Sequence, residues 1–96
     1  MNSLGEKIRT IRESKSILLR QVAAYLEIDT ALISKIERGE RRLTREQVVK
    51  LAKFYNATDE ELLTLWLSDK LLDTIENDPF AMQGLNKAKN ILKTLI

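Results

Sequence analysis

Apolar residues recur every three or four positions along almost the whole chain, a spacing that predicts helices rather than strands. Six stretches carry this spacing, at about residues 3–14, 19–26, 30–38, 45–55, 59–77 and 79–95. The stretches up to about residue 66 supply enough apolar positions for one common core, whereas the last stretch has an apolar stripe of its own. The pattern therefore predicts an all-α protein in which five helices share a core and a sixth helix is additional.

Residues that start and stop helices lie at the ends of these stretches. A Ser or Thr followed three residues later by Glu or Gln predicts a capping box, in which each side chain bonds the other residue's backbone N–H. The pattern occurs at Ser3 and Glu6, at Thr44 and Gln47, and at Thr58 and Glu61. Asn56 is typical of a left-handed helix terminator, and Asp78-Pro79 is typical of an N-cap followed by the first helical residue.

The segment from Val22 to Arg41 holds two short predicted helices joined by a tight turn. The turn ends at Asp29, a good N-cap residue, and Gly39 stops the second helix. Ile33 and Ile36 lie on one face of that second helix. The other face carries Thr30, Ala31, Ser34 and Lys35. Two short helices connected in this way are typical of hairpins that read duplex DNA, so these four residues are the candidates for base contacts.

The charge of the chain is unevenly divided. Residues 1–45 hold ten Lys or Arg and six Asp or Glu, a net of +4, whereas residues 46–96 hold six and eight, a net of −2. Four arginines follow the predicted reading helix within eight residues: Arg38, Arg41, Arg42 and Arg45. A basic surface beside a reading helix predicts contacts with DNA phosphates. The alternative is a solvated run of arginines in a small protein whose halves differ by a few charges.

The composition excludes several classes of site. The chain has no Cys and no His, which removes disulfides, thiolate metal sites, the commonest general base and the commonest metal ligand. The acidic cluster Asp59, Glu60 and Glu61 begins a predicted helix, where the helix dipole favours carboxylates without any catalytic role. We therefore expect no enzyme, cofactor, metal or small-molecule substrate. The absence of a signal peptide and of a long apolar run predicts a cytoplasmic protein away from membranes.

The pattern Val22-Ala23-x-x-Leu26-x-Ile28-Asp29-x-x-x-Ile33-Ser34-x-Ile36-Glu37-x-Gly39 resembles the XRE family of helix-turn-helix regulators, the phage-repressor and Cro type. The resemblance covers about residues 4–66. Residues 33–41 are also similar, more weakly, to the controller proteins of restriction–modification systems. The resemblance implies a five-helix DNA-binding domain at residues 1–66 that binds inverted repeats as a homodimer and regulates transcription, as a repressor or autoregulator by analogy.

The family likeness also implies roles for particular residues. Its base-reading positions fall on Thr30, Ala31, Ser34 and Lys35, and its backbone-gripping positions on Arg38, Arg41 and the start of the helix at 19–26. A structural ion pair is implied between Arg12 and Glu37, which orients the reading helix. The chain departs from the family at Leu18 and Leu19, which replace a Thr or Ser and a Gln, at Glu27, which replaces a turn glycine, and at Leu32. We expect these leucines to pack on one another rather than to form an apolar patch.

Residues 67–96 fall outside the resemblance and form a C-terminal helical extension. Its last helix needs an apolar surface to pack on, because isolated helices of this length are marginal in water. We expect it to dimerise together with the preceding helix, and the alternative is that it folds back on that helix. Phe54, Trp66, Phe80 and the isoleucines are expected in the core. An antitoxin or adaptor with a protein as its main partner is the alternative function.

Overall fold

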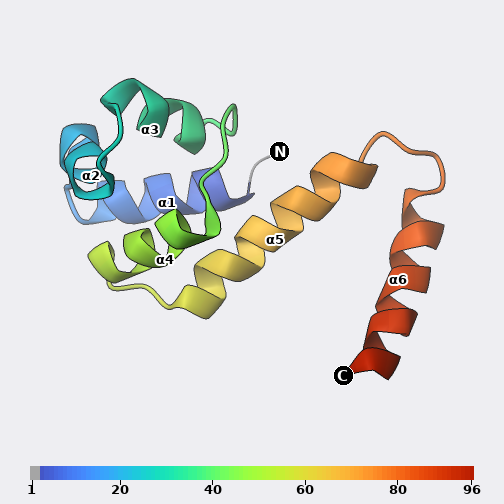
Figure 1. Cartoon of the computed structure of the whole chain (residues 1–96). Coiled ribbons are helices and arrows are strands. Elements are labelled where there is room, and N and C mark those ends of the chain that lie inside the picture. Colours follow the sequence, from blue (N-terminus) through green and yellow to red (C-terminus); the bar gives the residue numbers. More distant parts are fainter. Residues whose placement is uncertain (1–2) are drawn as a thin grey trace.

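The computed structural model describes residues 3–96, with Ser3 described in its backbone alone, and these residues form six α-helices and no strand. The helices are α1 (Ser3–Ser14), α2 (Leu19–Leu26), α3 (Thr30–Glu37), α4 (Arg45–Phe54), α5 (Asp59–Ile75) and α6 (Ala81–Leu95). Figure 1 shows α1 to α4 and the start of α5 gathered into one globular part, with α6 at the far end of α5. The predicted all-α class and the extra C-terminal helix are confirmed.

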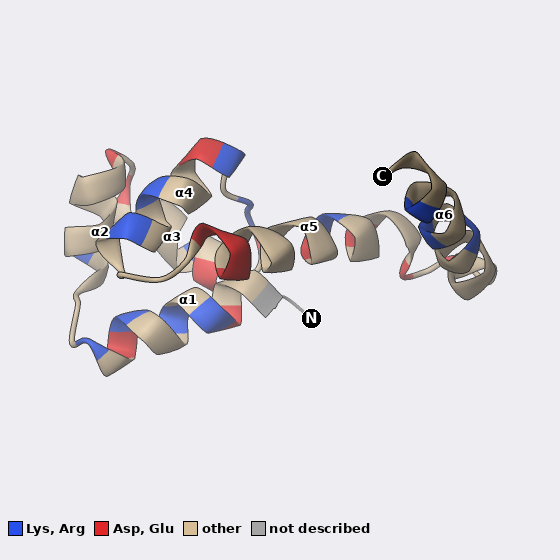
Figure 2. Cartoon of the chain, turned by 90° about the horizontal axis from the view of Figure 1, so that it is seen from below, with Lys and Arg blue, Asp and Glu red and all other residues tan. Residues whose placement is uncertain are grey.

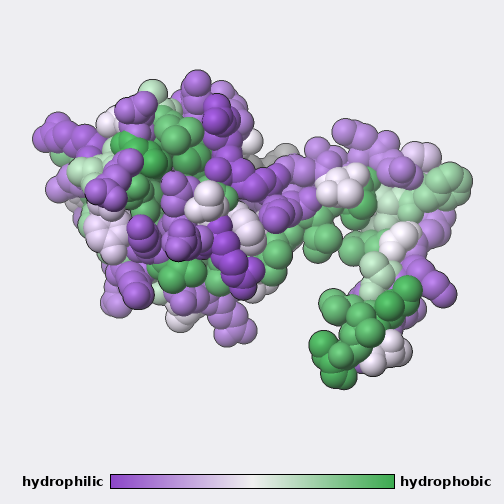
Figure 3. All heavy atoms as spheres, in the orientation of Figure 1, coloured by the Kyte–Doolittle hydropathy of each residue, from purple (hydrophilic) through white to green (hydrophobic). Residues whose placement is uncertain are grey.

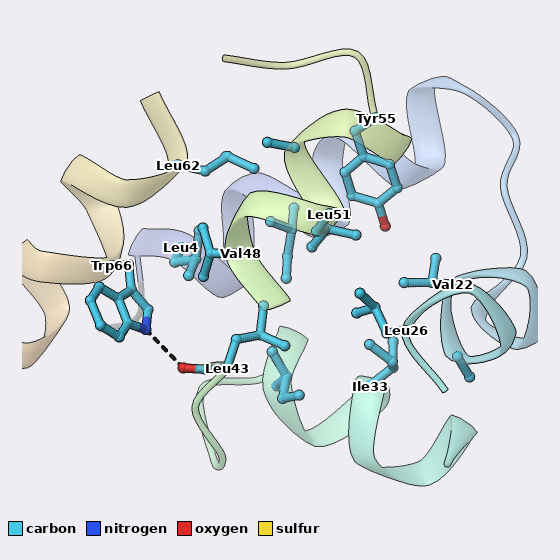
Figure 4. Close-up of a cluster of buried hydrophobic side chains, with 14 residues drawn as sticks. Leu4, Val22, Leu26, Ile33, Leu43, Val48, Leu51, Tyr55, Leu62 and Trp66 are labelled. Carbon is cyan, nitrogen blue, oxygen red and sulfur yellow. Dashed lines mark hydrogen bonds between the residues drawn. The ribbon is translucent and has the colours of Figure 1, made fainter. Parts of the chain in front are cut away.

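One core unites α1 to α5, as Figure 4 shows. It buries the apolar residues that the helical spacing places on one face of each helix. Its members are Leu4, Ile8, Val22, Ala23, Leu26, Ile33, Ile36, Leu43, Val48, Leu51, Ala52, Tyr55, Leu62 and Trp66. The Trp66 indole Nε1 donates to the Leu43 carbonyl oxygen at 2.8 Å, so the large ring at the edge of the core is also satisfied as a donor.

The helix ends follow the predicted caps closely but not everywhere. Thr44 and Gln47 form the full capping box, with side chain to backbone N–H distances of 2.9 and 3.2 Å. Thr58 accepts from the Glu61 N–H at 3.1 Å, but the Glu61 carboxylate pairs with Lys7 instead of completing the box. The box at Ser3 depends on a side chain outside the described residues. Asp29 has the extended backbone of an N-cap, yet its side chain makes no capping bond.

Four helix ends use the left-handed backbone: Ser16 follows α1 at φ 55° and Gly39 follows α3 at φ 82°, and two further residues end α2 and α4. Glu27 ends α2 at φ 58°, where the sequence predicts strain because glycine is usual there, and Asn56 follows α4 at φ 55°. The next residue closes each end, since the Ile28 N–H donates to Ala23 at 3.0 Å and the Ala57 N–H donates to Ala52 at 2.8 Å. These two turns set the angles at which α3 and α5 leave the preceding helices.

The join between α5 and α6 differs from its prediction. Helix α5 ends at Ile75, and α6 begins at Ala81 rather than at Pro79. Asp78 caps a short turn instead, because its Oδ1 accepts from the Phe80 N–H at 2.8 Å and its carbonyl accepts from the Ala81 N–H at 3.1 Å. Phe80 is 69 % exposed, so its predicted place in the core is wrong.

Helix α6 stands apart from the globular part. None of its residues is buried, and Ile91 and Ile96, which were expected in the core, are 49 % and 94 % exposed. The radius of gyration is 15.1 Å, against about 12 Å for a compact chain of this length. Figure 3 shows apolar atoms on α6 turned toward open space beside the end of α5. The predicted boundary at residue 66 lies inside α5, which runs through it unbroken.

Candidate nucleic-acid interface

Helix α3 lies at the outer edge of the globular part (Figure 1), and its residues divide into a buried face and an open face. Ile33, Ile36 and Glu37 are buried on the inner face. On the outer face Thr30, Ala31 and Lys35 are exposed and Ser34 is half-buried. The structure therefore brings the four predicted base-contacting residues together on one open helix face. Among the described residues, no ion pair engages Lys35.

Two of the predicted contacts are bonded to each other. The Arg38 guanidinium donates through Nη1 to the Ser34 hydroxyl at 2.6 Å and through Nε to Glu40 Oε2 at 2.6 Å. The hydrogen bond between Arg38 and Glu40 raises the pKa of Arg38 and lowers the pKa of Glu40. All three side chains lie near the surface, where an ion pair is weak. A phosphate could therefore replace Glu40 as the partner of Arg38 Nε, while the Ser34 hydroxyl bonds a different nitrogen of Arg38, Nη1.

The other arginines differ in their partners. Arg42 forms an ion pair with Asp73 of α5, and the Arg45 guanidinium lies 5.9 Å from the ring centroid of Trp66. Lys70 lies over the same ring at 4.4 Å. Arg41 is exposed and makes no ion pair with any described residue. Together with the Trp66–Leu43 bond, these contacts anchor the loop between α3 and α4 to α5.

Charged residues are mixed on the globular part, and Figure 2 shows acidic and basic residues side by side on its helices. Glu27, Asp29 and Glu40 are exposed acidic residues in the turns at either end of α3. Among the described residues, Lys35 on α3 and Arg41 and Arg45 after it are exposed cations for which no ion pair is found. A phosphate-binding surface here would depend on these residues before it depends on Arg38 and Arg42, which are paired.

Arg12 and Glu37 form a two-bond ion pair beneath α3. Arg12 Nε donates to Glu37 Oε2 at 2.7 Å, and Arg12 Nη2 donates to Oε1 at 3.1 Å. Arg12 Nη1 also donates to the Ile17 carbonyl at 3.0 Å, which ties the loop after α1 to the same group. The two side chains are only 13 % and 5 % exposed, and the hydrogen bond to Glu37 raises the pKa of Arg12. This geometry links α1 to the end of α3 and thereby orients the open face.

The three leucines that depart from the family take different positions. Leu19 and Leu32 are partly buried and pack against the core, whereas the expectation was that the leucines pack on one another. Leu18 is 46 % exposed, so it does not share their packing. Its backbone N–H donates to Gln21 Oε1 at 2.7 Å, which is one half of a capping box, and the Leu18 side chain makes no capping bond.

Two buried polar groups were missed from the sequence. Asp69 is 8 % exposed and accepts from the Leu4 N–H at 3.0 Å, so α5 caps the start of α1. Asp69 lies seven residues after Leu62 on the same buried stripe of α5, and this spacing was the sequence signal for its burial. The Tyr55 hydroxyl is buried without a hydrogen-bond partner among the described residues, and burial raises the pKa of Tyr55. The sequence signal for the burial of Tyr55 was its place at the end of the apolar stripe of α4.

Comparisons with known proteins agree with this geometry. A family model described as a helix-turn-helix domain matches residues 3–65, about two thirds of the chain. The HTH-type transcriptional repressor RghR of Bacillus subtilis is 36% identical over 50 residues, which cover 52% of this chain and 37% of that protein. An uncharacterized HTH-type transcriptional regulator of the same organism, RghRB, is 34% identical over 50 residues, covering 52% and 36%.

The matched part spans little more than a third of the length of these two relatives, and neither printed name concerns restriction–modification. No solved structure matches the chain. Among residues 3–96, no helix is long and apolar enough to cross a membrane. The buried stripes, the open face of α3 and the matched family model agree: the chain belongs to the helix-turn-helix domain family, of the XRE type.

Proposed function

We propose that this protein is a sequence-specific transcriptional regulator that binds duplex DNA with α3 in the major groove. The observation that carries the proposal is the two-sided nature of α3. Its apolar side is fixed in the core by Ile33 and Ile36, and its open side presents four residues that can reach base edges. The family match and the regulator names of the two relatives support DNA binding over an antitoxin or adaptor role.

Lys35 is the principal base-reading residue in this proposal. It is exposed and makes no ion pair within the described part of the chain, and a lysine in the major groove can donate to guanine O6 and N7. Thr30 and Ala31 present methyl groups that suit the C5-methyl of thymine. The Ser34 hydroxyl accepts from Arg38 and can still donate its own proton to a base or a phosphate. Because this set offers modest direct readout, DNA shape and deformability supply part of the specificity.

Phosphate binding begins with Arg41, which needs no rearrangement to bind an anion. Arg45 follows, because its contact with the Trp66 ring leaves its charge unneutralised. Arg38 and Arg42 contribute to the extent that phosphates displace Glu40 and Asp73 from them. Each phosphate that is neutralised steepens the dependence of log affinity on log salt by about 0.9.

The functional unit in this proposal is a homodimer on an inverted repeat. Residues 1–66 act as the DNA-binding domain, and residues 67–96 act as the extension that dimerises. A two-fold dimer places two copies of α3 on half-sites about one helical turn apart. We infer repression from the printed name of one relative, and we assign no catalytic step and no cofactor. A protein that reads DNA acts where the DNA lies, which in a bacterium is the cytoplasm.

The test is selection of bound sequences from a random duplex pool at near-physiological salt, with the purified chain. The proposal expects an enriched inverted repeat whose half-sites lie about one helical turn apart. Enrichment of a single half-site would remove the dimer from the proposal. Weak, strongly salt-dependent binding without enrichment would overturn sequence-specific recognition.

A further inference from the structure

The C-terminal third of the chain holds most of its exposed apolar surface. Of twelve large hydrophobic residues that are exposed in the described structure, ten lie beyond Trp66. They are Leu67, Leu71, Leu72, Phe80, Met82, Leu85, Ile91, Leu92, Leu95 and Ile96, with exposed fractions from 36 % to 94 %. These side chains offer on the order of 1,000 Å² of apolar surface, which meets the ~800 Å² per partner of a standard protein interface.

Helix α5 changes its apolar face halfway along. Leu62 and Trp66 point into the core, but Leu67 and Leu71 are exposed and are followed at the same spacing by Ile75. At 100° per residue, Leu71 lies roughly 140° from Trp66 around the helix axis. The second half of α5 therefore presents an apolar stripe that the core of its own globular part does not cover.

Helix α6 carries a matching stripe with a basic border. Leu85, Ala88, Leu92 and Leu95 recur at helical spacing on one face. By the same helical geometry, Lys87 lies along one edge of this stripe, and Lys89 and Lys93 lie along the other. Figure 2 shows these lysines along α6 and no acidic residue on it, and Figure 3 shows its apolar side facing the open space beside α5.

The turn between the two helices keeps α6 off its own α5. The Asp78 N–H donates to Ile75 at 2.9 Å, and Asp78 in turn accepts from the N–H groups of Phe80 and Ala81. Pro79 fixes a further backbone angle within the turn. These bonds hold the turn in a conformation that leaves the stripe of α5 uncovered by the α6 of the same chain.

The charges of the two segments favour contact between α6 of one copy and the end of α5 of another. Residues 67–79 carry Asp69, Lys70, Asp73, Glu76 and Asp78, a net of −3, of which Asp69 is buried against the Leu4 N–H and Asp73 pairs with Arg42. Residues 80–96 carry three lysines and no acidic residue, a net of +3. Two α6 helices packed only on each other would bring +6 together, whereas α6 against the α5 end of a second copy joins opposite charges.

We propose that α6 of one copy packs on the Leu67–Leu71–Ile75 stripe of a second copy's α5, and reciprocally, so that the exchanged helices form a two-fold dimer core. The proposal rests on the homodimer of the proposed function and assigns its interface. The exchange is self-complementary, as a two-fold contact requires, because each copy gives one α6 and receives one. Since α5 also anchors the loop that carries Arg41 and Arg42, the exchanged pair holds the two α3 helices at a fixed relation.

The absence of cysteine from the chain allows a clean cross-linking test. One preparation carries Leu71→Cys, and a second, shortened or lengthened by a tag, carries Leu85→Cys, Ala88→Cys or Leu92→Cys. The two are mixed, allowed to exchange and oxidised. We expect a mixed disulfide between Leu71→Cys and at least one of the three α6 variants. Asn90→Cys, on the opposite face of α6, serves as the control and forms none.

Three results would overturn the exchange. They are disulfides between copies of the same α6 variant without any mixed product, an intrachain disulfide in a monomeric double variant, and a monomer by sedimentation at the tested concentrations. The sequence selection described above separates the two proposals. An enriched inverted repeat without mixed disulfides refutes the exchange and leaves the regulator, whereas mixed disulfides without any DNA preference refute the regulator and leave the exchange.

Discussion

Replacing Glu37 by alanine should destabilise the fold before it changes which DNA is bound. The Glu37 carboxylate is 5 % exposed and receives two hydrogen bonds from Arg12, whose own side chain is 13 % exposed. Without Glu37 the guanidinium keeps only the Ile17 carbonyl as a partner. A charge that stays in a mostly buried place without its counter-ion raises the free energy of the folded state.

The expected loss is about 3–5 kcal/mol, the usual cost of breaking one partner of a buried ion pair. A small domain has a free energy of unfolding of about 5–15 kcal/mol, so the loss removes a large part of the stability. Each kcal/mol lowers the melting temperature of a domain this size by roughly 4–8 °C, which predicts a drop of at least ~12 °C.

Urea unfolding of Glu37→Ala, Arg12→Met, the double variant Arg12→Met/Glu37→Ala and the parent measures the coupling directly. The double variant should recover much of the loss, because it leaves no unpaired charge. Glu13→Ala is the matched control, since Glu13 pairs with Arg9 at 3.5 Å with both side chains more than half exposed, and it should change stability by less than ~1 kcal/mol. Single variants as stable as the parent, or purely additive effects, would refute the reasoning.

Three further predictions concern single groups. Burial raises the pKa of Tyr55 above its ordinary value near 10, so the parent should lose stability as the pH rises above about 10. Tyr55→Phe should lose less, as urea unfolding at pH 8 and 10.5 will show. An equal fall in the free energy of unfolding for the parent and the variant between these pH values would contradict this. Arg41→Ala should flatten the slope of log DNA affinity on log salt concentration by about 0.9. Arg42→Ala should change this slope less, because Arg42 already pairs with Asp73. If titrations at several salt concentrations give the reverse order, Arg41 does not contact a phosphate. Glu27→Gly should raise the free energy of unfolding by about 1 kcal/mol, because Glu27 has a φ of 58°; a loss of stability on urea unfolding would contradict the strain.

Local rules predicted much of the fold, because they act over three to seven residues. The stripes of α2 and α4, the Thr44 cap and the left-handed Asn56 all follow from spacing and residue type, and the structure has each of them. The predicted end of α5 and start of α6 were off by a few residues. There the Asp78 side chain formed a separate turn instead of capping the helix directly.

What the sequence could not predict depends on contacts between distant residues. The pairing of Arg42 with Asp73, 31 positions away, and the capping of Leu4 by Asp69, 65 positions away, arise only once α5 lies beside α1 and the loop after α3. Phe80 looked like a core residue because of its size, but it follows a turn that carries the chain away from the core. The Arg12–Glu37 contact was expected from family likeness rather than from spacing.

The most direct test of the account is the effect of Lys35→Ala on the ratio of specific to non-specific DNA affinity at fixed salt. Lys53→Ala, which removes an exposed lysine of α4, is the matched control. The account predicts that Lys35→Ala lowers the ratio by about 5- to 150-fold, equivalent to 1–3 kcal/mol of base discrimination, while Lys53→Ala leaves the ratio unchanged. Equal ratios for Lys35→Ala and the parent, with both still binding DNA, would contradict base reading by the open face of α3.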